Sequence, residues 1–375
     1  MAKKDKKPIT CIYHKGEGKP SKEHLVQRAL GGNLTRDFVC QKCNTDLSKI
    51  DQELVERSFI SFSRVAKQAA DADSVKLGGQ HYWVHPAFDE AVEVEVGFGL
   101  KSKMKPSLLF DVTTGRVMGA FADHDDVKAF CKAVREHIAK GKLKSVPLLD
   151  PPDDQEKFRL CRLTLHRGDE FYLRFPSSIA DREKIKNHLL SVIENQVDAI
   201  ESQLLNPATP VPQQKQEIPS VILNTAININ KTHRAIAKLA FNMLAYQMSV
   251  DFVLQAEFDS IRDYIVGKDV RDIPATEDFP AHDPRFVRRL PPDADLPFPR
   301  AADDEHLIII QYIHPNVVVG IDFYGQNYYL VECGAVGVSH DILHCHVFDF
   351  IKKTNRPLDI HELADRIKTL FSSSI

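Results

Sequence analysis

The sequence predicts a mixed α+β fold in which a small N-terminal segment precedes a larger body. Segments with apolar residues at every second position, typical of strands, alternate with segments in which apolar residues recur every three or four positions, typical of helices. Charge is also uneven: residues 1–50 hold eleven Lys/Arg against five Asp/Glu, although the whole chain has a net charge of −3. A basic segment on a mildly acidic body suggests that this segment contacts a polyanion.

The first predicted helix runs from Cys40 to about Ala70, because Leu47, Leu54 and Phe59 fall on one apolar face. Beyond it, the patterns predict several strands, two helices and one hairpin. The strands are expected at 81–84, 92–98, 108–112 and 117–121, a helix between Asp126 and Gly141, the hairpin from 160–165 and 171–175, and a long helix at 181–205.

The second half of the chain predicts a buried helix followed by a sheet. Residues 206–220 contain four prolines, which indicates a linker or an exposed loop. Residues 232–248 are strongly apolar and predict a helix at the centre of a core, with Lys238 interpreted as part of a flank exposed to water. Residues 267–305 are rich in Pro and Asp and are expected to be irregular. Strands are then expected at 306–313, 317–323 and 327–333.

A chain of 375 residues exceeds what one hydrophobic core usually organises, so several domains are expected. The predicted regions are an N-terminal module at 1–65, an α+β region at 66–205, a linker or exposed loop at 206–220, and a C-terminal α+β region at 221–375.

Composition excludes several classes of protein. The nearly balanced charge excludes a uniformly basic, histone-like protein and an acidic disordered tail. The longest apolar runs fall far short of the ~20 residues that cross a bilayer, and the basic N-terminus leads into no apolar segment of a signal peptide. Seven unevenly spaced cysteines do not suggest a disulfide framework. We therefore predict a cytoplasmic protein without membrane contact.

Three of the seven cysteines lie in the first 43 residues, where their spacing predicts a metal site. Cys11 and His14 form a C-x2-H pair, and Cys40 and Cys43 form a C-x2-C pair. A two-residue spacing lets a tight turn direct both ligands of a pair at one ion, and two such pairs complete a tetrahedron. A structural Zn²⁺ would stabilise a segment too small to fold by burial alone. A second group, His340, His344, Cys345 and His346, is interpreted as a strand because no partner pair is evident.

Between the two pairs lie Glu23-His24, Gly31-Gly32-Asn33 and, directly after Cys43, Asn44. In this order the segment resembles the HNH endonuclease family, in particular its zinc-bound subgroup. The resemblance covers residues 9 to about 60. It implies a ββα-metal unit with a strand at 22–27, a second strand near 37–39 and a helix from about residue 41. The predicted fold class is therefore α+β, with a small N-terminal ββα-metal HNH module and a larger mixed α+β body.

The resemblance also implies roles for four side chains. His24 matches the general base that takes a proton from water, and an ordinary pKa of ~6.5 suits that task. Glu23 matches an acidic ligand of a catalytic divalent ion, and Asn44 matches its second ligand. Asn33 matches the residue that ties down the loop and orients the base. Oxygen ligands favour Mg²⁺ or Mn²⁺ over zinc as the catalytic ion.

Because successive strand residues point to opposite faces, Glu23 and His24 need a local twist or an ion at the strand edge to act together. His14, where a cysteine is commoner, and Glu23, where Asp is commoner, depart from the family pattern. Phosphate contacts are the natural role of the nearby cations, Lys22, Arg28, Arg36 and Lys42.

The first functional hypothesis is thus a metal-dependent endonuclease that hydrolyses phosphodiester bonds, in DNA rather than RNA, with the body recognising or sensing the target. By analogy, such an arrangement suggests a restriction or anti-phage effector. Cutting both strands with one site per chain would favour a homodimer. The alternatives are a zinc-bound nucleic-acid-binding protein without catalysis, and a body that is itself an enzyme or sensor, for which no phosphate-binding loop or nucleophile elbow is found.

Overall fold

The structure is a computed structural model of the chain. The residues that it describes are 7–67, 77–85, 90–111, 114, 116–121, 124–149, 160–166, 170–176, 178–206, 222–268, 285–291, 299–337 and 342–372.

The chain divides into two compact units, and their boundaries differ from the predicted ones. The first unit combines Met1–Gly78, Gly97–Leu100 and Ala226–Ile375, and the second combines Gly79–Val96 and Lys101–Thr225. The N-terminal segment is therefore not a module of its own, because it belongs to the same compact unit as the C-terminal region. The predicted linker at 206–220 lies almost entirely outside the described residues.

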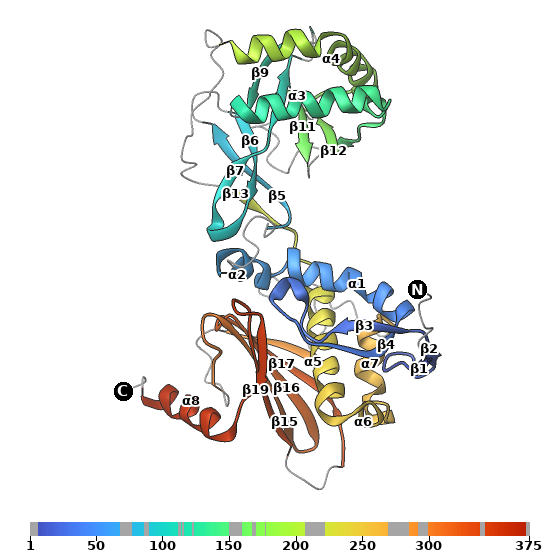
Figure 1. Cartoon of the computed structure of the whole chain (residues 1–375), viewed down its shortest axis with the longest axis vertical. Helices are drawn as coiled ribbons and strands as arrows, with labels where there is room; N and C mark the ends of the chain where they lie inside the picture. Colours follow the sequence, from blue (N-terminus) through green and yellow to red (C-terminus); the bar gives the residue numbers. More distant parts are fainter. Residues whose placement is uncertain are drawn as a thin grey trace, which may run out of the picture. The chain divides into compact units, whose positions relative to one another are not determined.

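A six-stranded antiparallel sheet forms the base of the first unit (Figure 1). Its strand order is β14-β17-β16-β15-β18-β19. The three strands predicted between 306 and 333 are confirmed as β15, β16 and β17, and β18 contains the predicted strand around His344–His346. β14 lies inside the segment expected to be irregular. The bounds are β14 Val287–Leu290, β15 Glu305–Ile313, β16 Asn316–Phe323, β17 Asn327–Ala335, β18 Leu343–Asp349 and β19 Thr354–Pro357.

The two faces of this sheet carry separate apolar cores, because side chains alternate along each strand. On β15, Ile308 and Ile310 belong to the large core that includes the buried helix α5 (Ile229–Met248), whereas Leu307 and Ile309 face a smaller core with Leu363 of helix α8 (Ile360–Ser372). The prediction that 232–248 is a central buried helix is confirmed. Two short helices follow α5, namely α6 (Val250–Val253) and α7 (Asp259–Val266).

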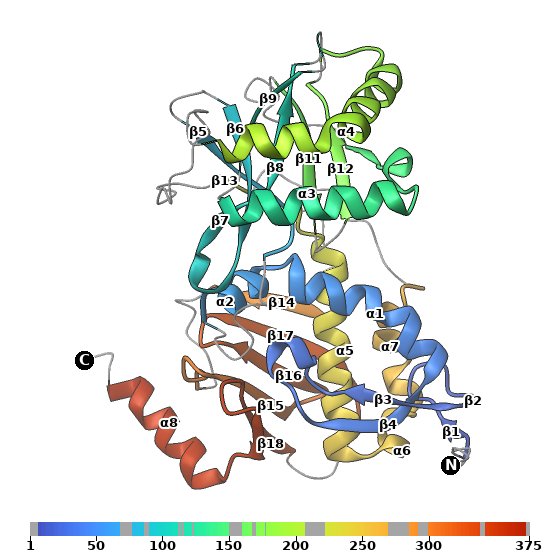
Figure 2. The same cartoon turned by 45° about the horizontal axis from the view of Figure 1, so that its top comes forward.

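The N-terminal segment packs into the large core rather than standing alone. Its apolar side chains, such as Leu25, Val26 and Leu54, are fully buried together with residues of α5. The segment contains two strand pairs and a helix, which lie alongside α5 in Figures 1 and 2. The elements are β1 (Ile9–Thr10), β2 (Glu17–Gly18), β3 (Pro20–His24), β4 (Thr35–Cys40) and α1 (Gln41–Glu56), with a 3₁₀ turn, η1, at Arg28–Leu30.

The helix predicted from Cys40 to about Ala70 is interrupted after Glu56. A second helix, α2, begins at Phe59 and runs to Lys67. The buried Ser58 explains the break, because its hydroxyl accepts the backbone N–H of Ile60 and donates to the carbonyl of Leu54. A serine that bonds to the local backbone in this way competes with a continuous helix.

The second unit has two sheets and two long helices. The two predicted helices are confirmed as α3 (His124–Ala139) and α4 (Arg182–Leu205). They share one core with a five-stranded sheet. The predicted hairpin is confirmed as β11 and β12. The five-stranded sheet has the order β10-β12-β11-β8-β9, and the second sheet has the order β13-β5-β6-β7. Their bounds are β5 Gln80–His85, β6 Glu90–Val96, β7 Ser102–Met104, β8 Ser107–Phe110, β9 Val117–Phe121, β10 Leu148–Leu149, β11 Cys161–His166, β12 Glu170–Arg174 and β13 Ile222–Asn224.

The chain is therefore mixed α+β, as predicted. Within the described residues, no helix is both long enough and apolar enough to pass through a membrane.

Candidate functional site

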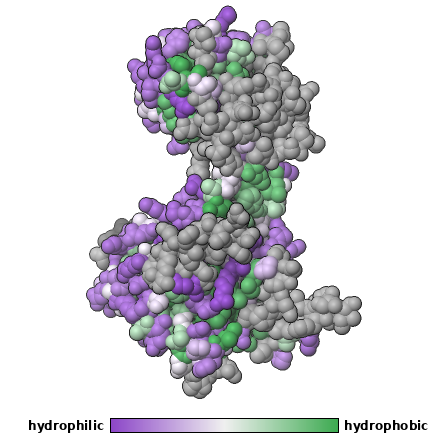
Figure 3. Space-filling view, turned by 180° about the vertical axis from the view of Figure 1, so that it is seen from behind, coloured by the Kyte–Doolittle hydropathy of each residue, from purple (hydrophilic) through white to green (hydrophobic). Residues whose placement is uncertain are grey.

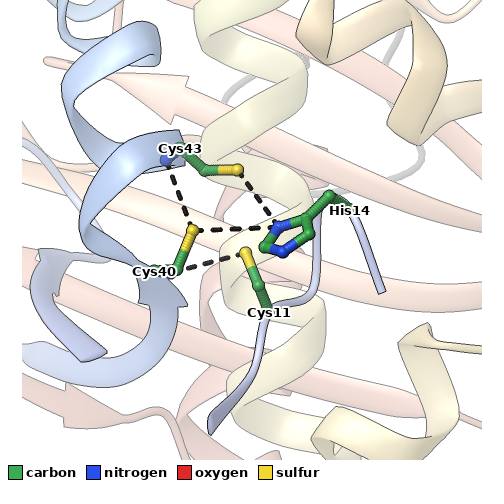
Figure 4. Close-up of side chains that lie close together, drawn as sticks. All are labelled: Cys11, His14, Cys40 and Cys43. Atoms are coloured by element: carbon green, nitrogen blue, oxygen red, sulfur yellow. Dashed lines mark hydrogen bonds between the residues drawn. The ribbon is translucent and has the colours of Figure 1, made fainter. Parts of the chain in front are cut away.

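The two Cys/His pairs predicted from spacing come together in the first unit (Figure 4). Cys11 and His14 lie in the segment between β1 and β2, Cys40 ends β4, and Cys43 lies in the first turn of α1. Their ligand atoms are all within 4.8 Å of one another. His14 Nδ1 is 3.7 Å from the Cys40 sulfur and 3.4 Å from the Cys43 sulfur. Two ligands of a tetrahedral zinc ion are about 3.5–4 Å apart, so the group could hold such an ion.

Backbone N–H groups turn toward two of these sulfurs. The N–H of Cys43 donates to Cys40 Sγ, and the N–H of Cys40 donates to Cys11 Sγ, each at 3.4 Å. Burial alone would raise the pKa of Cys40, but the backbone N–H and the side chain of Cys43, together with the side chain of Cys11, stabilise its thiolate and bring that pKa below its ordinary value. Because the thiolate is the form that binds metal, these bonds favour the ligand state of Cys40.

The Glu23 carboxylate points into the core of the unit and not toward solvent. It is 3% exposed, and its Oε1 lies 2.6 Å from Lys238 Nζ on α5. Asn242, one turn further along α5, donates to the same oxygen at 3.1 Å. Lys238 Nζ also lies 2.5 Å from Asp51 of α1. Lys238 is therefore buried between two carboxylates, which corrects the interpretation that it lies on a flank exposed to water.

The charges of this buried cluster are unbalanced, since two carboxylates share one ammonium group. Burial raises the pKa of Glu23 above its ordinary value, and the attraction of Lys238 does not fully offset that effect. Burial lowers the pKa of Lys238, but the carboxylates of Asp51 and Glu23 outweigh it, so the net shift is upward. Lys238 therefore stays charged and occupies the position at which a cation would neutralise Glu23.

His24 is on the same strand but in a different environment. Its ring is half-buried, and burial together with the positive charges of Arg28 and Lys238 lowers its pKa below the ordinary value. Its Nδ1 is shielded from solvent and has no hydrogen-bond partner among the described residues. Nε2 is therefore the ring nitrogen that can exchange a proton with water. The imidazole is neutral at pH 7, which is the state that a general base needs.

The loop between β3 and β4 depends on two adjacent glycines. Gly31 has φ of +87°, and a Cβ there would lie 2.4 Å from Cβ of Phe350. A Cβ at Gly32 would lie 1.9 Å from the carbonyl oxygen of Val26. Only glycine fits both positions, because one combines a left-handed backbone with close contact and the other touches the backbone itself.

Side chains from distant parts of the chain hold this loop. His306 of β15, which is completely buried, contacts the carbonyl oxygen of Leu30 through Nε2 at 2.7 Å. Because that oxygen can only accept, Nε2 carries the proton, and burial lowers the pKa of His306 to about 4. Arg64 of α2 donates to the carbonyl of Ala29 at 2.9 Å. No local sequence pattern indicated these two residues, because their partners are backbone oxygens far away in sequence.

Asn33 and Asn44 do not converge on Glu23. Asn33 is exposed, and its side chain contacts the carbonyl of Lys353 and the side chain of Asn355 at the edge of the six-stranded sheet. Asn44 is half-buried and donates to the hydroxyl of Ser21 at 2.8 Å. This hydrogen bond connects the first turn of helix α1 to β3.

The catalytic Mg²⁺ or Mn²⁺ implied by the resemblance does not fit Glu23 and Asn44 as they lie here. A hard cation needs accessible oxygen ligands, whereas the Glu23 carboxylate is buried and paired with Lys238. The role of Glu23 as a metal ligand is corrected accordingly. Among the His, Cys, Asp and Glu side chains of the described residues, the group of Cys11, His14, Cys40 and Cys43 is the one that could hold an ion. His340 lies outside the described residues, and His344 and His346 are not part of such a group.

The four predicted phosphate-contacting cations are all exposed. They are Lys22, Arg28, Arg36 and Lys42. The guanidinium of Arg36 lies 4.5 Å above the ring of Tyr246. Lys42 lines an open hollow of about 510 Å³ beside the Cys/His group, together with Lys19 and His14. Viewed from behind, the flank of the first unit that contains β1 and β2 is largely hydrophilic (Figure 3).

No family model, no curated protein and no solved structure matches this chain.

Proposed function

We propose that this protein is an endonuclease that hydrolyses phosphodiester bonds in nucleic acid, DNA rather than RNA, and that its N-terminal segment is a zinc-stabilised unit of the HNH type. Two observations support the proposal: the Cys/His group beside the β3–β4 pair and α1, and the state of His24. The imidazole of His24 carries the proposal, since it is half-buried, kept neutral by burial and nearby cations, and located on the strand where the resemblance places a base.

The chemistry of the four ligands favours zinc as their metal. Three thiolates and one imidazole suit Zn²⁺ better than the hard cations, which prefer oxygen. A full set of four protein ligands leaves no open position for water or substrate, so the ion would be structural. It would link the segment between β1 and β2 to β4 and α1 through Cys11, Cys40 and Cys43.

In the proposed reaction, Nε2 of His24 accepts a proton from a water molecule whose oxygen attacks the phosphorus. The phosphorus–oxygen bond to the leaving nucleotide breaks, the departing oxygen takes a proton from solvent water, and the negative phosphate is held by exposed cations such as Arg28 and Lys22. A divalent ion would add charge neutralisation at the phosphate. No step is assigned to such an ion, because Glu23 and Asn44 do not present a site for it. The rest of the first unit and the second unit would recognise or sense the target.

The experiment compares wild type with His24→Ala on supercoiled plasmid and on single-stranded RNA, each with Mg²⁺, with Mn²⁺ and with EDTA. We expect wild type to relax or linearise the plasmid and His24→Ala to lose on the order of 10²–10⁴-fold in rate, the usual contribution of a positioned acid or base. His344→Ala is the matched control, because this half-buried histidine lies on β18 and has no part in the proposed chemistry.

Equal rates for wild type and His24→Ala would remove His24 from the mechanism. Cleavage of RNA but not of plasmid would show that the substrate is RNA rather than DNA. Cleavage that continues unchanged in EDTA would mean that no divalent ion takes part in the reaction.

A second function is favoured by the burial of Glu23. A zinc-bound nucleic-acid-binding protein without catalysis needs no accessible carboxylate beside a histidine, and the Glu23–Lys238 ion pair suits such a structural role. In that case His24→Ala would bind DNA as wild type does, neither protein would cleave it, and affinity would fall with salt as phosphate contacts require.

A further inference from the structure

Four side chains and one backbone carbonyl form a continuous chain of hydrogen bonds from α5 to the β3–β4 loop. Gln247 Nε2 lies 3.0 Å from His346 Nδ1, and His346 Nε2 lies 3.5 Å from Asn355 Oδ1. Asn355 Nδ2 lies 2.5 Å from Asn33 Oδ1. The chain ends where Asn33 Nδ2 contacts the carbonyl oxygen of Lys353. Asn33 thus connects the loop to β18, β19 and α5.

The last acceptor determines the direction of every bond in this chain. The carbonyl of Lys353 can only accept, so the amide nitrogen of Asn33 must face it and the amide oxygen must face Asn355. Asn355 therefore donates to Asn33 and offers its own oxygen to His346. Nε2 of His346 must then carry the proton, and Nδ1 must accept from Gln247. Only the neutral imidazole, in one tautomer, satisfies the chain.

The middle of the chain is rigidly held. His346 is 3% exposed, and its ring packs edge-on against Tyr246 with 5.9 Å between centroids. The ring of Phe348 contacts it from the same strand at 5.3 Å. Burial lowers the pKa of His346, in agreement with the neutral form that the hydrogen bonds require. A fixed residue therefore sits between α5 and the exposed side chain of Asn33.

Asn33 is next to the end of the strand pair that carries His24. His24 pairs with Thr35, and the N–H of Leu25 donates to the carbonyl of Leu34 at 3.0 Å. Asn33 directly precedes Leu34, so a displacement of Asn33 acts on the backbone that supports His24. His306 and Arg64 contact the middle of the loop, at η1. The end of the loop at Asn33 is contacted by the hydrogen-bond chain instead.

We infer that Asn355, His346 and Gln247 are positioning residues for the proposed nuclease: they hold Asn33, and through it the strand end that carries His24. This inference rests on the proposed function. None of the three acts on substrate. They would matter because a displacement of about 1 Å in a catalytic group can cost on the order of 100-fold in rate.

The test compares Asn355→Ala, His346→Leu and His346→Gln with wild type in two measurements: kcat and KM on plasmid, and hydrogen exchange of the backbone amides of residues 25–34. We expect the first two variants to lower kcat on the order of 10–100-fold with little change in KM, and to speed exchange in the loop. His346→Gln should retain most of the activity, because the glutamine amide can still donate to Asn355. His344→Leu, two residues earlier on β18, is the matched control and should match wild type.

Unchanged kcat and unchanged loop exchange in Asn355→Ala and His346→Leu would overturn the inference while leaving the proposed function intact. Faster exchange throughout the sheet, or an equal loss of kcat in His344→Leu, would also overturn it, since the effect would then be general destabilisation. If wild type itself cleaves nothing, the proposed function fails, and loop exchange still decides whether these residues hold Asn33.

Discussion

Two buried glutamates, one in each unit of the chain, show how differently the same side chain behaves at the same depth. Glu23 in the first unit and Glu93 in the second are both 3% exposed. Burial raises the pKa of Glu23, and the nearby Lys238 offsets this only in part. Burial would also raise the pKa of Glu93, but Arg174 at 2.9 Å and Lys105 at 3.8 Å outweigh it and the pKa falls.

The difference comes from the balance of charge around each carboxylate. In the first unit two carboxylates, Glu23 and Asp51, share the ammonium of Lys238. In the second unit Glu93 faces Arg174 and Lys105 and also accepts from the hydroxyl of Tyr172. Burial therefore does not by itself set the charge state of a carboxylate; the number of cations within reach decides it.

Removal of the metal should produce the largest difference in stability between the two units. Cys40→Ser, or a chelator that strips the proposed zinc, should destabilise the first unit by about 4 kcal/mol or more, the effect of losing a ligand present at about 1,000 times its Kd. The second unit, with Glu93, should unfold as before. Calorimetry with parallel zinc analysis measures both, and we expect one zinc ion per wild-type chain.

Cys345→Ser is the control for this experiment, because Cys345 is a buried cysteine of the first unit outside the four-ligand group. It should leave the zinc content unchanged. Retention of zinc by Cys40→Ser, or an equal loss of stability in both units, would contradict the proposed structural site.

Removal of the shared cation should produce the next largest effect. Lys238→Met leaves Glu23 and Asp51 facing each other without the ammonium group, and breaking a buried ion pair in this way costs about 3–5 kcal/mol. Urea unfolding at pH 7 measures the loss. Lys231→Met, at an exposed position of the same helix, should change the free energy of unfolding by no more than about 0.5 kcal/mol. A loss below 1 kcal/mol for Lys238→Met would show that the carboxylates do not depend on Lys238.

The smallest effects come from replacing each glutamate by glutamine and following stability with pH. The pKa of Glu23 is raised in the folded protein, so its contribution is complete below its ordinary pKa and is lost as pH rises through the raised value. The contribution of Glu93 has the opposite sign: it is present above its ordinary pKa and is lost as pH falls through the lowered value. Glu23→Gln should remove the first dependence and Glu93→Gln the second.

Each of these slopes is at most about 1.4 kcal/mol per pH unit. At pH 7 Glu93→Gln should cost more than Glu23→Gln, because Lys238 keeps Asp51 as a partner at 2.5 Å. Urea unfolding from about pH 3, which is below the ordinary pKa of a glutamate, up to pH 7 gives both slopes. For each glutamate, the slope is the pH dependence of the difference in stability between wild type and the glutamine variant. The same sign for both slopes would refute the comparison between the glutamates.

Local patterns predicted a large part of the fold. Short apolar runs located β15, β16 and β17, and helical patterns located α4 and α5, because each pattern records that the element is buried. The C-x2-H and C-x2-C pairs also predicted the Cys/His group, since spacing within a tight turn fixes where two ligands point. The break at Ser58 was missed, because a serine hydroxyl can end a helix or simply face water.

The association of the N-terminal segment with the C-terminal region could not be predicted from such patterns. An apolar face on Leu47 and Leu54 shows that α1 is buried but does not show against what. The structure places it in one core with α5. Lys238 illustrates the same limit: a lysine within an apolar helix is ordinarily exposed, and only the approach of Glu23 and Asp51 from other elements makes its burial favourable.

By itself, then, the sequence determined the α+β class, most strands and helices, and the four residues able to gather around a metal ion, because these properties depend on periodicity or on ligands a few residues apart. The tertiary structure decided which carboxylates have cations beside them, which loop ends are held and by what, and how the chain divides. It buries Glu23 against Lys238 and connects Asn33 to His346 through Asn355. Those outcomes depend on electrostatic and hydrogen-bond partners that only folding brings within 3 to 4 Å, and no local pattern encodes such encounters.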